Sequence, residues 1–276
     1  MTRVLLLHPG AMGASVGAAL ARAGHETLWV SGGRSAATRQ RAEQAGLRAV
    51  SDLAAAASGA EVAISVCPPE AAAEVARAVT DAGFVGTFVD ANAISPATAT
   101  AIGGIVGERF VDGGIIGPPA WRAGVMRLYL SGERAAGVAA LFAGTPVDAR
   151  ALPHPIGAAS ALKMCYAAYT KGSSALLLGV RALAQRLGIT DALLAEWALS
   201  QPSLEARSNT AARNTSPKAW RFEGEMREIA ATCRDAELPD GFHAAAAEVY
   251  ARMAVLKTQD DASIDDVIAA LTKKPR

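Results

Sequence analysis

The stretch that decides the fold of this chain is Val4-Leu5-Leu6-Leu7-His8-Pro9-Gly10-Ala11-Met12-Gly13. Its first four residues are apolar and predict a short buried strand. An alanine-rich segment of helical period follows from Met12 to Ala23 and is closed by a glycine. Glycines in such a strand–helix turn let the backbone approach a pyrophosphate, to which the helix N-terminus offers N–H groups. We therefore expect Gly10, Ala11, Met12 and Gly13 to bind a dinucleotide, and an ordinary strand–helix turn is the alternative.

The turn does not carry the whole GxGxxG pattern, because His8 stands where the first glycine belongs. Pro9 restricts the residue before it, so His8 is expected to be extended. About 20 residues further on, an NAD site carries an acid that holds the ribose 2′-hydroxyl. This chain has Ser31-Gly32-Gly33-Arg34-Ser35 there, and a guanidinium with hydroxyls suits a 2′-phosphate. We predict that Ser31, Arg34 and Ser35 bind NADP, with NAD as the less favoured cofactor and Arg34 as a solvated loop cation as the alternative.

Short β-type runs alternate with helical segments up to about residue 150, which predicts an α/β domain of Rossmann type with a mostly parallel sheet. The last runs have little helix between some of them, which suggests a sheet edge finished by antiparallel strands. After Pro153-His154-Pro155 the strand signals stop and the chain reads as all-α. We predict a Rossmann domain over residues 1–155 and an all-α domain over residues 156–276. The strands are expected at 4–7, 27–30, 62–66, 87–89, 110–116, 128–131 and 146–152, and the main helices at 12–23, 36–45, 70–82, 157–187, 191–199, 203–213, 217–236, 241–254 and 263–272.

Composition excludes several classes of function. The 276 residues carry 27 Lys and Arg against 26 Asp and Glu, so the clustered positive charge that a general nucleic-acid binder needs is missing. No apolar run approaches the ~20 residues that span a bilayer. The three cysteines and four histidines show no spacing typical of a metal site, so no structural metal is expected. We expect a soluble cytoplasmic protein that acts on a small molecule.

Two later loops follow predicted strands at the sheet edge where ligands of α/β proteins bind. Cys67-Pro68 follows the strand at 62–66, and Asn92 follows the strand at 87–89. Both loops are candidates for contacts with the nicotinamide or the substrate, or are mere connections. Asn92 is either a turn former or a ligand contact.

The strongest catalytic candidate lies in the long helix predicted from Gly157 to Leu187. Positions 163, 167, 170, 171 and 174 share one helical face, and this face carries Lys163, Thr170 and Lys171. Lys163 could protonate a carbonyl oxygen, and burial with the nearby charge of Lys171 would lower its pKa towards the range of an acid/base catalyst. A solvated helix face is the alternative explanation.

Several motifs occur in the order seen in the β-hydroxyacid dehydrogenases, which are similar to 6-phosphogluconate dehydrogenase. They are Gly10-Ala11-Met12-Gly13, the Cys67-Pro68 loop, Asp90 to Pro96, Phe110-Val111-Asp112-Gly113-Gly114-Ile115-Ile116-Gly117, and Gly157 six residues before Lys163. The C-terminal stretches Ser160 to Gly172 and Gly224 to His243 resemble a subgroup of phosphogluconate-dehydrogenase-like oxidoreductases whose C-terminal domain has no assigned function. The resemblance covers nearly the whole chain.

The resemblance implies a Rossmann domain, an all-α domain that mediates dimerisation, and a catalytic lysine at Lys163. It also implies substrate contacts at Asn92 and Gly117 and a residue near Glu228 that closes over the cofactor. Two departures concern the substrate: Ala167 replaces the family's asparagine, and Ile116-Gly117-Pro118 replaces its Ser-Gly-Gly loop. The candidates to shape a different pocket are Tyr166, Thr170, Lys171, Trp121, Arg122 and Trp220, although the aromatic ones could equally be core residues.

We therefore predict an NAD(P)-dependent dehydrogenase or reductase, with NADP(H) favoured, that acts on a carbonyl/alcohol pair with Lys163 as general acid/base. An imine reductase is the nearest alternative, since those enzymes share the fold but generally replace the lysine. A non-catalytic NADP-binding sensor or scaffold is the alternative of a different class. Such a protein would need the glycine turn and Arg34 but not Lys163.

Overall fold

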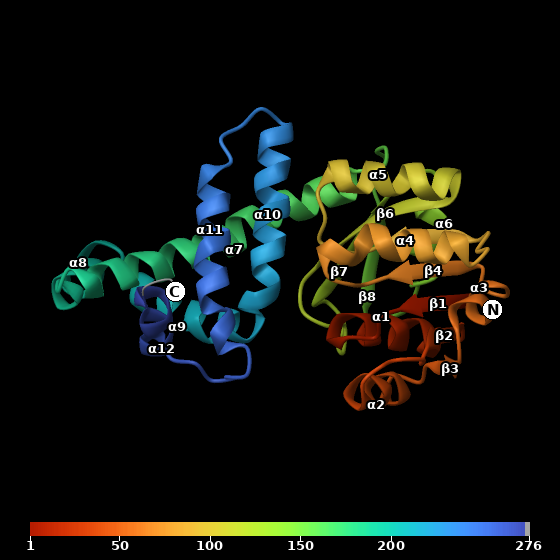
Figure 1. Cartoon of the computed structure of the whole chain (residues 1–276), viewed down its shortest axis with the longest axis horizontal. Helices are drawn as coiled ribbons and strands as arrows, with labels where there is room; N and C mark the ends of the chain where they lie inside the picture. Colours follow the sequence, from red (N-terminus) through yellow and green to blue (C-terminus); the bar gives the residue numbers. More distant parts are fainter. Residues whose placement is uncertain (274–276) are drawn as a thin grey trace. The chain divides into compact units, whose positions relative to one another are not determined.

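The structure is a computed structural model that describes residues 1–273 (Figure 1). The chain forms two compact units, and the first, Met1–Met164, is built around an eight-stranded sheet. The strand order is β3-β2-β1-β4-β5-β6-β7-β8. The strands from β3 to β6 in this order run parallel, β7 is antiparallel to β6, and β8 is parallel to β7. The Rossmann-type sheet is thus confirmed, and its last two strands run against the rest. The strands are β1 (Arg3–Leu7), β2 (Glu26–Val30), β3 (Arg48–Val50), β4 (Val62–Ser65), β5 (Thr87–Asp90), β6 (Phe110–Ile116), β7 (Met126–Ser131) and β8 (Val147–Ala151).

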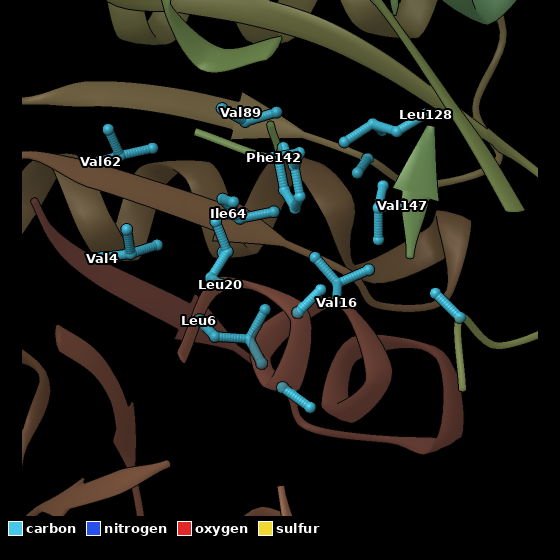
Figure 2. Close-up of a cluster of buried hydrophobic side chains, with 14 of the residues drawn as sticks. Val4, Leu6, Val16, Leu20, Val62, Ile64, Val89, Leu128, Phe142 and Val147 are labelled. Atoms are coloured by element: carbon cyan, nitrogen blue, oxygen red, sulfur yellow. The ribbon is translucent and has the colours of Figure 1, made fainter. Parts of the chain in front are cut away.

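Helices cover both faces of this sheet, and the side chains of each strand alternate between two apolar clusters. Val4 and Leu6 point into the cluster that α1 and α6 cover, whereas Leu5 and Leu7 point into the cluster that α3, α4 and α5 cover. Figure 2 shows the first cluster, where Leu20 of α1 lies with residues of neighbouring strands. The helices of this unit are α1 (Ala11–Arg22), α2 (Ala36–Gln44), α3 (Leu53–Ala57), η1 (Pro69–Ala71), α4 (Ala72–Asp81), α5 (Pro96–Val106), η2 (Gly107–Arg109) and α6 (Ala135–Ala140).

The second unit, Cys165–Arg276, is helical throughout its described part. It begins within the long helix α7, and its core holds Tyr250, whose hydroxyl donates to the Lys171 carbonyl oxygen at 2.8 Å. The all-α prediction is confirmed, although the predicted domain extends to residue 276 and residues 274–276 lie outside the described part. The helices are α7 (Ala158–Arg186), α8 (Thr190–Ser200), α9 (Leu204–Thr215), η3 (Ser216–Lys218), α10 (Ala219–Asp235), α11 (Gly241–Met253), η4 (Ala254–Leu256) and α12 (Ile264–Thr272).

The long helix α7 passes through Gly172 without a break, and packing gives the reason. A Cβ at Gly172 would lie 3.0 Å from the ring of Phe242, which belongs to α11. The glycine therefore lets α11 approach α7 closely, and this contact offsets its low helix propensity.

Among residues 1–273, no helix is both long and apolar enough to cross a membrane, and no group of three or more His, Cys, Asp and Glu side chains could hold a metal ion.

Candidate functional site

The glycine turn after β1 closes although His8 replaces its first glycine. His8 adopts a φ of 66°, in the left-handed region that glycine favours, so the expectation of an extended His8 is wrong. Histidine enters this region more readily than most side chains do. The Gly10 N–H donates to the His8 carbonyl oxygen at 2.7 Å, and a Cβ at Gly13 would lie only 2.5 Å from the same oxygen. Gly13 is therefore required by the fold of the turn itself.

Gly10, in contrast, is not required by the fold. Its φ of −69° suits any residue, and a Cβ there would meet no atom within 4 Å. Gly10 is the N-cap of α1, no side chain caps this helix end, and its first turn holds no acidic residue. The first N–H groups of a helix have no partner within it and favour an anion. The open space at Gly10 fits a phosphate group that lies against this helix end.

Two arginines border the turn on the side of β2 and α2. Arg41 of α2 donates from Nε to the Pro9 carbonyl oxygen at 3.5 Å and from Nη2 to Thr38 Oγ1 at 3.2 Å. Arg34 lies close enough to His8 to affect its titration. Burial, and secondly this guanidinium, lower the pKa of His8 to about 4, so the imidazole is neutral at neutral pH. Positive charge beside the turn thus comes from the arginines.

The two serines of the same region already take part in local hydrogen bonds. The Ser31 hydroxyl donates to the Val50 carbonyl oxygen at 3.1 Å, and Ser35 Oγ accepts from the Thr38 N–H at 3.3 Å as the N-cap of α2. Each hydroxyl therefore has a structural role. The Ser31 oxygen can still accept a hydrogen bond, and the Ser35 hydroxyl can still donate one. The predicted role of Ser31 and Ser35 in binding the cofactor stays a prediction.

Asn92 joins the two strand-end loops that follow β4 and β5. Its side chain is 3% exposed, and its Oδ1 accepts from the Cys67 N–H at 2.5 Å. Its Nδ2 donates to Ser65 Oγ at 3.2 Å and to Asp90 Oδ2 at 2.8 Å. Both protons of the amide are used, so Asn92 holds the loops together, and only its Oδ1 has a lone pair left for a substrate.

Burial shifts two titratable groups in this network. Burial raises the pKa of Asp90 to about 7, and hydrogen bonds from Asn92 partly oppose the shift. Burial likewise raises the pKa of the Cys67 thiol to about 11, so it is not a thiolate at neutral pH. Cys67 therefore offers its backbone rather than a reactive sulfur, while Pro68 is exposed next to it.

Gly117, the predicted substrate contact at the end of β6, has a conformational reason to be glycine. Its φ is 113°, and a Cβ would lie 2.0 Å from the Val125 carbonyl oxygen. Its backbone thus has to turn at this point whether or not a substrate is present.

Lys163 lies over β6, near the sheet edge that carries the loops just described. A Cβ at Gly114 would lie 3.0 Å from the Lys163 Cβ and 2.7 Å from the Ala159 carbonyl oxygen. The glycine therefore lets α7 cross β6 in close contact. The glycine turn, Asn92 and Gly117 follow the parallel strands β1, β5 and β6, so all three lie at the same end of the sheet, with β4 between β1 and β5.

The other predicted site residues belong to the second unit. Lys171 forms an ion pair with Glu225 and lies 4.6 Å from the centre of the Phe222 ring. Glu225 thus compensates its charge within the second unit, and the expected effect of Lys171 on Lys163 stays a prediction. Thr170 Oγ1 donates to the Tyr166 carbonyl oxygen at 3.1 Å, and Glu228 lies half-buried on α10.

The aromatic candidates are not core residues. Trp121, Tyr166 and Trp220 are 52%, 45% and 38% exposed, respectively. The contacts of Arg41 and the buried carboxylate of Asp112 were missed from the sequence. Asp112 belongs to the motif from Phe110 to Gly117, which could have indicated its importance. No motif includes Arg41, which lies on a largely exposed stretch of α2.

Comparison with known proteins relates both halves of the chain to described families. Residues 3–92 match the family model "NADP oxidoreductase coenzyme F420-dependent", and residues 184–253 match a domain of unknown function, DUF1932. A curated relative, an uncharacterized 28.5 kDa protein of Methanothermus fervidus, is 33% identical over 165 residues. The alignment covers 59% of this chain and 63% of the relative, which is less than two thirds of it.

Three solved structures share the fold over nearly the whole chain. Conserved protein MTH1747, whose structure is described as similar to 3-hydroxyacid dehydrogenases, is 27% identical, with a TM-score of 0.66 and coverage of 94% of this chain and 99% of that one. A Mycobacterium tuberculosis 3-hydroxyisobutyrate dehydrogenase is 20% identical, with a TM-score of 0.71 and coverage of 99% and 100%. An Aspergillus terreus reductive aminase in complex with NADPH is 18% identical, with a TM-score of 0.55 and coverage of 98% and 99%.

The two family models divide between the Rossmann half and the helical half in the order that the motifs predict, and the solved structures extend the likeness to both halves. The resemblance seen in the sequence is thereby confirmed. The chain thus resembles the β-hydroxyacid dehydrogenase-like family in sequence and fold, and its residues 184–253 match the DUF1932 domain.

Proposed function

We propose that this protein is a cytoplasmic oxidoreductase that uses NADP(H) and interconverts a carbonyl compound and its alcohol, with Lys163 as general acid/base. The single observation that carries the proposal is the open space at Gly10. A glycine that the fold does not need stands at an uncapped helix N-terminus. This end faces the switch point between β1 and β4, where dinucleotides bind in doubly wound sheets.

The residues around the turn fit a nicotinamide dinucleotide. Gly10, Ala11, Met12 and Gly13 would hold its pyrophosphate through their N–H groups, and Arg34, with Ser31 and Ser35, would hold a 2′-phosphate. The loop of Cys67 and Pro68 would contact the nicotinamide half. The cofactor would supply or accept the hydride, while the protein supplies binding, orientation and the proton.

Lys163 is the proposed proton donor for the carbonyl oxygen in the direction of reduction. A lysine ammonium carries the proton that the oxygen needs as it becomes a hydroxyl, and it takes the proton back in the direction of oxidation. Gly117 and Asn92 Oδ1 would contact the substrate from the strand ends. Tyr166, Thr170 and Lys171 keep the proposed role of substrate contacts, and Glu228 that of a cofactor contact.

Replacing Arg34 with alanine is expected to reduce the preference for NADPH over NADH by about tenfold, or 1.4 kcal/mol. The guanidinium would bind only the 2′-phosphate, so the affinity for NADH should stay within about twofold. Parallel fluorescence titrations with the two cofactors measure the ratio. Arg39→Ala is the matched control, because Arg39 is exposed on α2 and its Nε donates to the Arg34 carbonyl oxygen. An unchanged ratio in Arg34→Ala would show that Arg34 is a solvated cation.

Two alternative functions, an imine reductase and a non-catalytic NADP sensor, can be distinguished from this proposal by assay. An imine reductase would share the fold of the reductive aminase, and a panel that contains imines as well as aldehydes, ketones and keto acids separates the two activities. A non-catalytic NADP sensor would bind the cofactor and reduce none of these compounds. Retention of a lysine at position 163 favours carbonyl chemistry over both.

We also propose that the protein is a homodimer through its C-terminal domain. On α7, Tyr166, Tyr169, Leu176 and Leu183 are all between 45% and 70% exposed. Their separations of three, seven and seven residues place them along one helical seam, as in a coiled coil. The occupant that fits this seam is the same helix of a second copy, because a two-fold axis brings identical faces together.

Replacing Leu183 with aspartate is expected to convert the dimer into a monomer, because it places a charge in an apolar seam that the dimer would bury. Light scattering coupled to gel filtration measures the mass. Leu199→Asp is the control, since Leu199 is 84% exposed but lies on α8. If the wild-type protein is monomeric, or if Leu183→Asp leaves it dimeric, α7 is not the interface.

A further inference from the structure

The carboxylate of Asp112 is fully buried on β6, and the proposed chemistry does not use it. Its Oδ2 accepts hydrogen bonds from the Gly157 N–H at 3.0 Å, the Ser160 N–H at 3.0 Å and the Ser131 hydroxyl at 2.9 Å. Its Oδ1 accepts from the Ser160 hydroxyl at 2.5 Å. A buried charge is costly unless hydrogen bonds compensate it, and here four of them do. Three of the four come from the start of α7.

Ser131 of β7 completes this attachment. Its hydroxyl oxygen accepts from the Ala159 N–H at 3.1 Å while its proton goes to Asp112. The N–H groups of Gly157, Ala159 and Ser160 therefore all end on side chains of β6 and β7. These are the groups that a helix leaves without partners in its first turn, and a carboxylate there also matches the positive end of the helix dipole. The sheet thus provides the cap of α7.

Two residues after Asp112 on the same face of β6, Gly114 fixes the next turn of α7. Its missing side chain allows the Lys163 Cβ and the Ala159 carbonyl oxygen to lie against the strand. The start of α7 is thus held at two points of β6, by hydrogen bonds to Asp112 and by the close contact of Gly114 with Ala159 and Lys163. A displacement of about 1 Å in a catalytic group can cost about 100-fold in rate.

We propose that Asp112, acting through Ser131 and the first turn of α7, is a positioning residue for Lys163. The Asp-Gly-Gly sequence of residues 112–114 fixes the position of the proposed catalytic lysine on β6. The inference rests on the proposed role of Lys163. It assigns Asp112 no contact with substrate or cofactor.

The test is competitive labelling of the lysines of the intact protein with trace acetic anhydride, followed by mass spectrometry. Lys218 and Lys257 are exposed and serve as internal references in each sample. Asp112→Asn keeps the size of the side chain but turns an amide group towards N–H donors. The labelling rate of Lys163 relative to the references is expected to change at least about threefold. A displacement of α7 would change both the exposure of the Lys163 amine and its basicity.

A second variant displaces Lys163 without replacing a polar side chain. Gly114→Ala adds one Cβ that would press on the Ala159 carbonyl oxygen and on the Lys163 Cβ, and it should change the relative labelling in the same way. It also replaces Asp112→Asn if that variant does not fold. Gly104→Ala in α5 is the matched control, because a Cβ there meets no atom within 4 Å.

The readout separates this inference from the proposed function. Labelling requires neither cofactor nor substrate, so a protein without catalytic activity would still reveal whether β6 positions Lys163. If the variants lower the melting temperature while the relative labelling of Lys163 stays that of the wild type, Asp112 is a structural cap only and the inference is overturned. On an active enzyme, kcat should fall while the Kd of NADPH stays constant.

Discussion

Replacing Lys163 with methionine is expected to reduce the rate of carbonyl reduction by about 10²- to 10⁴-fold, the range typical of a lost general acid. Methionine keeps the length and helix propensity of the side chain, so α7 should keep its place over Gly114. The affinity for NADPH should stay within about twofold, because the residues proposed to hold the dinucleotide lie at the glycine turn and the loops after β2 and β4. The loss should therefore appear in kcat and not in cofactor binding.

The measurement is single-turnover oxidation of NADPH, followed at its absorbance, on the carbonyl compound that the wild-type protein reduces fastest. Lys218→Met is the control, since Lys218 is an exposed lysine of the second unit. Activity of Lys163→Met within a few-fold of the wild type would remove Lys163 from the chemistry. A wild-type protein that binds NADPH but reduces no compound of the panel would instead favour the sensor.

Replacing Gly10 with valine is expected to weaken NADPH binding by about 100-fold or more, which corresponds to about 2.7 kcal/mol. The valine side chain would fill the space where the pyrophosphate is proposed to lie. The melting temperature should hardly change, because a Cβ at Gly10 meets no atom within 4 Å and its φ of −69° suits any residue.

The comparison with Gly13 makes this prediction specific. Gly13→Ala places a Cβ 2.5 Å from the His8 carbonyl oxygen, so it should lower stability and binding together. Gly10→Val should lower binding alone. Thermal unfolding and fluorescence titration of the two variants distinguish the cases, and unaltered NADPH affinity in a well-folded Gly10→Val protein would mean that no phosphate lies there.

The sheet could be predicted from the sequence where strands are apolar and helices long. The strands β1 and β4 are buried over most of their length and read as short apolar runs, and α7 has a long helical period. The strand β3 was missed because it has only three residues, Arg48–Val50, none of them buried. The helix α5 was missed because its threonines and glycines are poor helix formers; the Ser95 cap and Pro96 favour its start.

The site was less predictable, because its decisive contacts join residues far apart in the chain. The restriction that Pro9 imposes indicated an extended His8, yet the closure of the turn holds that residue at a positive φ. The contact of Gly114 with Lys163 depends on how α7 crosses the sheet, which no local pattern encodes. Residue types therefore indicated the glycine turn and the lysine, whereas only the fold reveals that Asn92 faces the neighbouring loop and that Asp112 caps α7.

The most direct test of the central proposal is a titration of the purified protein with NADPH and, in parallel, with NADH, followed by quenching of tryptophan fluorescence. We expect saturable binding of both cofactors, with NADPH preferred by about tenfold or more, or 1.4 kcal/mol. If neither cofactor binds, the proposal is contradicted. The turn around His8 would then be a structural element that binds no dinucleotide.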